Sequence, residues 1–127
     1  MQRTFVLVDA QDRWLGLALA RRDGDRPGPA VLNAMWVSGA ARGRGAAGAL
    51  CDACAAWAAE RGLRELTLTV LADNGAARRA YEAAGFVVRG PTTRSRQGRA
   101  LDEFIDARLP EPHHDSGLRE FVMSRPL

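Results

Sequence analysis

Apolar residues recur along the chain with two different periods, and these periods predict the order of its strands and helices. Short runs rich in apolar and aromatic residues, or alternating apolar with polar residues, are typical of strands. Apolar residues at i, i+3, i+4 and i+7 are typical of an amphipathic helix. The expected strands are residues 4–8, 14–20, 30–37, 65–71, a strand that begins at residue 86, and 118–127. The expected helices are residues 45–61 and 75–84.

Turn-forming residues separate these elements without marking a boundary between domains. The polar connection 9–13 predicts an antiparallel hairpin, and the cluster of Gly, Pro and Asp in 21–29 predicts a turn. Residues 90–117 are polar, with apolar residues that indicate one or two helical turns at Leu101, Phe104, Ile105 and Leu109. The order strand, strand, strand, helix, strand, helix, strand, strand predicts one domain over 1–127, of the α/β or α+β class.

Composition narrows the class of protein. The chain has 127 residues, 46% hydrophobic and 26% charged, which is the range of a globular domain. No apolar run approaches the roughly 20 residues of a membrane-spanning helix, and the first residues lack the apolar core of a secretion signal. We therefore expect a cytoplasmic protein with no membrane partner.

The formal net charge of the chain is +3. All of its positively charged side chains apart from histidine are arginines, because the chain has no lysine. Such an excess suits a nucleic acid or a phosphate-bearing small ligand. The arginines are scattered and no aromatic residues alternate with them, so we expect no nucleic-acid partner.

Two cysteines, Cys51 and Cys54, form a C-x-x-C pair. Such a pair can indicate redox chemistry or half of a zinc site. Here it falls within an Ala-rich helical pattern, and the only histidines, His113 and His114, are distant in the sequence. We expect two buried packing residues and no metal site.

A glycine-rich stretch between the third strand and the first helix is the most informative part of the sequence. Gly43 and Gly45 allow a ligand to approach the backbone closely, and Arg42 and Arg44 add positive charge. The start of a helix contributes free N–H groups and the positive end of its dipole. The stretch is therefore a candidate phosphate or pyrophosphate site, and the alternative is a tight turn that needs glycine for its geometry alone.

Three kinds of nucleotide-binding motif are alternative interpretations of this stretch. Gly43, Gly45 and Gly48 spell G-x-G-x-x-G, and Asp73 lies near the acidic position of a Rossmann domain, but three strands precede the loop. A Walker loop is excluded because no G-K-[ST] follows. RNA-binding Arg-Gly segments are usually repetitive, and this one is a single copy.

A fourth interpretation accounts for more residues. The stretch resembles the acetyl-CoA-binding motif of the GNAT acyltransferase superfamily, in which R-G-x-G follows a strand that ends in Val. A second motif of that family, Asn, Ala, Tyr and Gly-Phe at fixed spacing, is matched further along. The matching residues are Val37, Arg42, Gly43, Gly45, Ala46, Ala47, Leu50, Asn74, Ala77, Tyr81, Gly85 and Phe86.

This resemblance implies a fold, a cofactor and a set of site residues. The fold would be a GNAT-like mixed, mainly antiparallel sheet flanked by helices, and acetyl-CoA would be the acetyl donor. The backbone of 42–47 would hold the pyrophosphate, with Arg42 and Arg44 adding charge. The strand residues Met35, Trp36 and Val37 would diverge from the next strand and bind pantetheine, together with Asn74 and Ala77. Tyr81 would be the general acid that protonates the leaving thiolate, with core packing as its alternative role.

The resemblance leaves the acceptor half of the reaction open. Family members usually begin with a strand and two helices that this sequence lacks, and no acidic residue lies between Arg26 and Cys51 to act as a base. Asn33 could order a water, and Glu120, Asp9 or the histidine pair could serve as the base. The proton could also pass through water to bulk solvent, so the base stays open. We expect an N-acetyltransferase that acts on a small-molecule or peptide amine. A homodimer is a further hypothesis. The alternative is a shortened, non-catalytic module that binds acyl-CoA or a partner.

Overall fold

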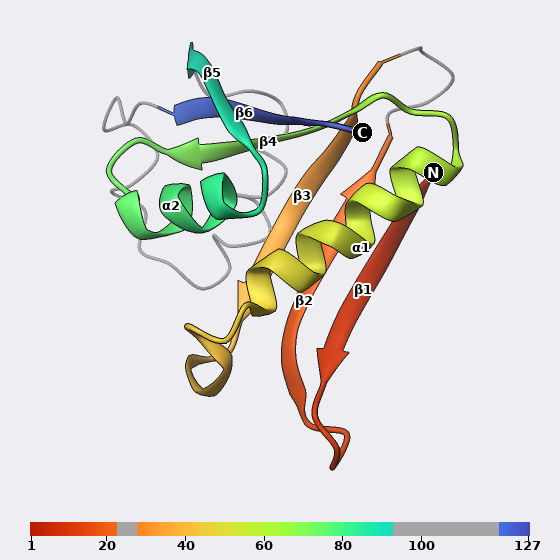
Figure 1. The fold of residues 1–127 in the computed structure, drawn as a ribbon, viewed down its shortest axis with the longest axis vertical. Coiled ribbons are helices and arrows are strands. Elements are labelled where there is room, and N and C mark those ends of the chain that lie inside the picture. The colour runs from red at the N-terminus through yellow and green to blue at the C-terminus, as the bar shows by residue number, and fades with distance from the viewer. Residues whose placement is uncertain (23–27, 93–119) are drawn as a thin grey trace, which may run out of the picture.

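The structure, a computed structural model, describes residues 1–22, 28–92 and 120–127 (Figure 1). Its elements follow the expected order of strands and helices. They are β1 (Gln2–Val8), β2 (Trp14–Arg21), β3 (Ala30–Val37), the 3-10 turn η1 (Gly39–Ala41), α1 (Ala46–Glu60), β4 (Glu65–Leu71), α2 (Gly75–Ala83), β5 (Val87–Thr92) and β6 (Glu120–Pro126).

The strands form one six-stranded sheet in the order β1-β2-β3-β4-β6-β5. All neighbouring pairs are antiparallel except β3 with β4, which are parallel. Figure 1 shows α1 crossing β1–β3, with α2 beside β4, and both helices lie over the same face of the sheet. The expectation of a mixed, mainly antiparallel sheet with helices is confirmed, and the Rossmann alternative is wrong because a doubly wound domain requires a parallel sheet.

The core lies between this sheet and α1. The helix buries one stripe of small and medium side chains, among them Leu50, Cys51 and Cys54, against Leu66 and Leu68 of β4. Burial raises the pKa of the Cys51 thiol to about 11 and of the Cys54 thiol to about 12. Both thiols are therefore protonated packing groups, as the helical pattern predicts.

Gly16 sets how closely the helix approaches the sheet. A Cβ atom at this position would lie 2.8 Å from the carbonyl oxygen of Trp36 and 3.1 Å from Cδ1 of Leu50. Ala18 and Ala20, the next residues on this face of β2, are fully buried. The small residues of β2 thus let α1 lie low over the sheet, which places its N-terminus beside the end of β3.

Most expected boundaries agree with the observed ones to within two residues, and the differences have local causes. Phe86 precedes β5 instead of opening it, because its buried ring packs edge-on against Tyr81 with the centroids 5.9 Å apart. The stretch expected as a plain loop after β3 contains the 3-10 turn η1. The expected helical turns at 101–109 and the His113–His114 pair lie outside the described residues.

The parallel pair β3 and β4 is the structural feature that shapes the site. The two strands pair only at Ala30 with Leu66 and Val31 with Thr67. A register shift between Leu19 and Ala20 of β2 marks a bulge in β3 near this point. Beyond it, β3 stays paired with β2 and β4 stays paired with β6, so the two halves of the sheet separate and leave a gap between them.

Candidate active site

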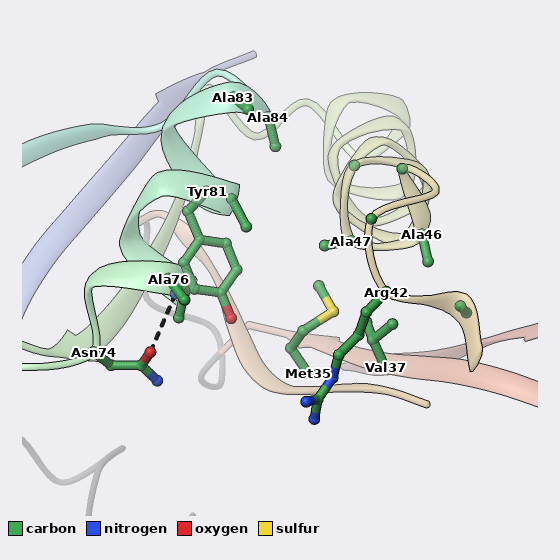
Figure 2. A pocket seen from close by; sticks show the side chains of 16 residues that line it. Met35, Val37, Arg42, Ala46, Ala47, Asn74, Ala76, Tyr81, Ala83 and Ala84 are labelled. Atoms are coloured by element: carbon green, nitrogen blue, oxygen red, sulfur yellow. Dashed lines mark hydrogen bonds between the residues drawn. The ribbon is translucent and has the colours of Figure 1, made fainter. Parts of the chain in front are cut away.

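A cavity of about 770 Å³ lies on the helix-covered side of this gap (Figure 2). Its size is within the range of ligand-binding pockets. It is bounded by the end of β3, the loop that leads into α1, and one face of α2. The lining residues are Met35, Val37, Ala41, Arg42, Gly43, Gly45, Ala46, Ala47, Gly48, Asn74, Ala76, Ala77, Ala80, Tyr81, Ala83 and Ala84.

The start of α1 presents unpaired backbone donors to this cavity. Gly45 is the N-cap, in the left-handed conformation at φ 79°, and it has no side chain that could accept a hydrogen bond. The first intrahelical bond runs from the Ala49 N–H to the Gly45 carbonyl oxygen, at 3.0 Å. The N–H groups of Ala46, Ala47 and Gly48 precede that bond and need an outside acceptor.

The two loop glycines leave the space above these donors open. Gly43 and Gly45 have φ 76° and 79°, and a Cβ atom built on either would meet no atom within 4 Å. The left-handed conformation explains why glycine occupies both positions. Free donors, a helix N-terminus and open space together fit a pyrophosphate group, so the residues present suit the acetyl-CoA that the sequence predicts.

The cationic residues of the loop differ in their placement. Both Arg42 and Arg44 are exposed, but only Arg42 lines the cavity. Trp36 also lies outside the lining, because it alternates with Met35 and Val37 along β3 and its side chain projects from the opposite face of the sheet. All the other residues expected to contact acetyl-CoA line the cavity.

Small side chains on α2 form the opposite wall. Asn74 is the N-cap of this helix, and its side-chain oxygen accepts a hydrogen bond from the Ala77 N–H at 3.1 Å. This bond commits the oxygen and leaves the amide NH₂ to contact a ligand. The alanines at 76, 80, 83 and 84 were not among the expected site residues, although their i, i+3, i+4 spacing is a visible signal that one face of the helix is small.

Tyr81 brings the one hydroxyl group of the cavity wall. Figure 2 shows its phenol oxygen directed away from α2 toward the side of the cavity where Met35 lies. Burial, with a smaller contribution from Cys51, raises the pKa of Tyr81 from 10.0 to about 12. The hydroxyl is therefore a hydrogen-bond donor throughout the neutral range. The edge-on contact with Phe86 holds the ring, so packing and a chemical role are compatible here.

None of the cavity-lining residues in the described part of the chain is Asp, Glu or His. Asp9, one candidate base, lies in the β1–β2 turn and is bonded to Arg13 at 2.8 Å. Its backbone hydrogen bond from Arg13 helps to lower its pKa, which makes it a weak base. Glu120 is buried at the start of β6 and is not a lining residue. The described residues also gather no cluster of His, Cys, Asp or Glu that could hold a metal ion.

Comparisons with known proteins agree with this geometry. A family model described as the acetyltransferase (GNAT) family matches residues 2–86. A solved structure of a GCN5-related N-acetyltransferase from Kribbella flavida is 31% identical, with a TM-score of 0.73 over 99% of this chain and 68% of that chain. Nourseothricin acetyltransferase is 26% identical, with a TM-score of 0.76 over 98% of this chain and 65% of that one. No curated protein matches the sequence.

A third structure, from Bacillus anthracis str. Ames, was solved in complex with acetyl coenzyme A and is described as a candidate streptothricin acetyltransferase. It shares the fold at 17% identity, with a TM-score of 0.75 over 99% of this chain and 62% of that chain. The chain thus spans about two thirds of the length of these three proteins. No helix in the described ranges is both long and apolar enough to cross a membrane. GNAT acetyltransferases use acetyl-CoA, and this chain belongs to the GNAT acetyltransferase family.

Proposed function

We propose that this chain is an acetyl-CoA-dependent N-acetyltransferase that moves an acetyl group directly to an amine. The observation that carries the proposal is the cavity itself. It joins free N–H groups at the start of α1, the diverging end of β3 and the Tyr81 hydroxyl in one space. These are the three kinds of group that the transfer needs: an anion site, backbone donors for a carbonyl oxygen, and a donor for the leaving sulfur.

When bound, acetyl-CoA supplies a thioester whose acetyl carbon is attacked by the amine nitrogen, while the sulfur leaves with the electron pair. The chain's own part begins at the start of α1, where the free backbone N–H groups of Ala46, Ala47 and Gly48 hold the pyrophosphate while Arg42 adds charge. The β3 backbone groups that point away from β2 have no β4 partner beyond Val31. They are free to bond pantetheine and to polarise the acetyl carbonyl.

The Tyr81 hydroxyl donates a hydrogen bond to the leaving sulfur. Its pKa of about 12 keeps it protonated before the reaction and makes complete loss of its proton costly. Tyr81 therefore stabilises the departing thiolate mainly as a hydrogen-bond donor. The proton released by the amine goes to solvent, since no carboxylate or imidazole in the described residues lines the cavity.

Calorimetric titration of acetyl-CoA into the wild-type chain tests the binding half of this proposal, and thiol release across a panel of amines tests the transfer half. We expect one acetyl-CoA site for each chain and release of CoA thiol that depends on the amine. The rival function, a non-catalytic acyl-CoA-binding module, is favoured because no described residue in the lining can act as a base. It predicts the same titration without amine-dependent thiol release. Cytoplasmic localisation and a homodimer stay predictions of the sequence.

A further inference from the structure

Arg125 of β6 joins the sheet to both helices that border the cavity. Its Nη1 atom donates one hydrogen bond to Oδ1 of Asp52 on α1, at 2.8 Å, and another to the carbonyl oxygen of Ala84, the C-cap of α2, at 2.9 Å. The side chain of Arg125 is 24% exposed, and that of Asp52 is 69% exposed. One nitrogen atom therefore connects three elements, and the acetyl transfer proposed above gives it no part.

The turn after α2 lies directly against the stem of this arginine. The carbonyl groups at the end of a helix lack partners within the helix, and a nearby cation is favourable there. Gly85 follows Ala84 in the left-handed conformation at φ 95°, and a Cβ atom built on it would lie 3.5 Å from Cδ of Arg125. The absence of a side chain at Gly85 thus leaves room for the stem, and the guanidinium reaches the helix end.

The helix α2 depends on such contacts because it buries little of its own surface. None of its nine residues, all of them described, is fully buried, and Tyr81 is only partly buried against the core. Near the middle of the helix, the guanidinium carbon of Arg78 lies 5.3 Å from the centre of the Phe121 ring of β6. This stacking contact ties α2 to the sheet, whereas the contact of Arg125 ties it to the sheet and to α1.

Both partners of Arg125 lie close, along their helices, to the groups that the transfer uses. Ala84 follows Tyr81 by three residues, a rise of about 4.5 Å, and Figure 2 shows both residues on the side of α2 that borders the cavity. Asp52 follows Gly48, the last of the free N–H groups of α1, by four residues, a rise of about 6 Å. Bonding Ala84 and Asp52 to one nitrogen therefore fixes the spacing between the Tyr81 hydroxyl and the anion site.

We propose that Arg125 is a positioning residue for Tyr81, which it keeps beside the leaving sulfur by holding α2 at a fixed distance from α1. Exposed ion pairs contribute little to stability, but hydrogen bonds from a guanidinium are short and directional, so the main effect of this contact is on position. The kinetic consequence rests on the proposed transferase function. The position of Tyr81 is measurable without turnover.

The first test uses the fact that Tyr81 is the only tyrosine of the chain. A chain labelled with 3-fluorotyrosine gives one ¹⁹F resonance, which we compare between the wild type and Arg125→Met, a variant with an apolar stem and no donors. Arg61→Met is the matched control, because Nη1 of Arg61 also donates to a helix carbonyl, that of Trp57 at 3.0 Å, at the other end of α1. The resonance of Arg125→Met should shift toward its position in the urea-unfolded chain, and that of Arg61→Met should not.

Two further variants separate the parts of the contact. Asp52→Ala removes only the bond to α1, at an exposed position where the fold tolerates the change, so it tests the proposal even if Arg125→Met does not fold. Its resonance should shift in the same direction by a smaller amount. Arg125→Lys keeps a cation with several N–H donors and should return the resonance toward the wild-type position. Circular dichroism verifies that each variant is folded.

The second test is kinetic and uses an amine that the wild type acetylates. Arg125→Met should lower the turnover number about tenfold or more, because a small displacement of a reacting group is costly, with the acetyl-CoA dissociation constant changed less than about threefold. In the Tyr81→Phe background the same substitution should lower turnover little further, since its effect passes through the hydroxyl.

Three outcomes decide between the interpretations. An unshifted resonance in a folded Arg125→Met variant with a lowered melting temperature would overturn the proposal and leave Arg125 a role in stability alone. Losses of turnover that multiply in the double variant would also overturn it. A shifted resonance in a chain that acetylates no amine would support the positioning of Tyr81 by Arg125 and count against the proposed enzyme activity, so the two failures are distinguishable.

Discussion

At the scale of single residues, the clearest chemical assignment is Tyr81. Its hydroxyl is the one phenolic donor of the chain, and the cavity places it opposite the end of β3. The spacing of Asn74, Ala77 and Tyr81 was visible in the sequence, and their meeting on one helix face follows from the helical period. The raised pKa of Tyr81 could not be read from the sequence, because it depends on burial by residues distant in the chain.

Replacing Tyr81 by Phe removes one oxygen and keeps the ring that packs on Phe86. We expect the turnover number to fall by about 10²–10³, the usual loss when one hydrogen bond to a developing anion is removed, while the acetyl-CoA dissociation constant stays nearly unchanged. Steady-state kinetics and calorimetry measure the two quantities. A variant with wild-type turnover and reduced thermal stability would instead assign Tyr81 to packing alone.

Two buried thiols and the half-buried Tyr81 make the fold sensitive to alkali. Burial raises the pKa of Cys51 to about 11, and the pKa values of Cys54 and Tyr81 to about 12, above their ordinary values of 9.0 and 10.0. A pKa raised on folding contributes stability that is complete below the unfolded pKa and is lost as the pH rises through the folded one. We therefore expect the melting temperature to decline from about pH 9 toward pH 12.

The variant Cys54→Ala checks this origin of alkaline sensitivity, because it removes one titrating group and leaves a small apolar side chain. Its melting temperature should fall less steeply above pH 9 than that of the wild type, whatever its value at neutral pH. Thermal denaturation followed by circular dichroism over a pH series gives both slopes. Parallel curves for the two proteins would show that Cys54 has no part in the effect.

At the scale of elements, the glycine loop and the start of α1 carry the proposed anion site. The sequence alone could not decide whether Gly43 and Gly45 serve a ligand or a turn; the structure shows a left-handed conformation at both and open space above them. Their positive φ values mean that any side chain there strains the loop, at about 1–2 kcal/mol for each residue, in addition to filling the ligand space. Loss of acetyl-CoA binding in such variants could therefore come either from the strained loop or from the filled ligand space.

Gly48 offers a cleaner test, because it lies within α1, lines the cavity, and has no atom within 4 Å of a built Cβ. Gly48→Leu should preserve or raise helix stability. It should weaken acetyl-CoA binding roughly five- to hundredfold, since steric overlap typically costs about 1–3 kcal/mol.

Gly39→Leu is the matched control, because Gly39 is equally open but does not line the cavity. Calorimetric titration of both variants, with melting curves to verify folding, decides the matter. If Gly48→Leu binds acetyl-CoA as tightly as Gly39→Leu does, the start of α1 is not part of the acetyl-CoA site.

At the scale of the whole molecule, the element order could be predicted because each element has a strong local period, as in β4 with Leu66, Leu68 and Val70 inward. The position of β6 between β4 and β5 could not, because that pairing joins segments far apart in sequence with no local signal. The divergence of β3 from β4 was implied only by the family resemblance, and the structure shows that the two strands pair at just two positions. Trp36 shows where the sequence-based prediction of the site failed. The residue was expected in the site because it lies between Met35 and Val37 in sequence, but it projects from the opposite face of the sheet.

The most direct test of the account is the fate of a labelled acetyl group. Wild-type chain is incubated with acetyl-CoA carrying ¹³C in the acetyl group and with each member of a panel of small-molecule and peptide amines, and the products are identified by mass spectrometry. We expect labelled acetyl on the nitrogen of at least one amine, with Tyr81→Phe forming the same product far more slowly. Bound but intact acetyl-CoA, or labelled acetate with every amine of the panel unmodified, would contradict the proposed transfer.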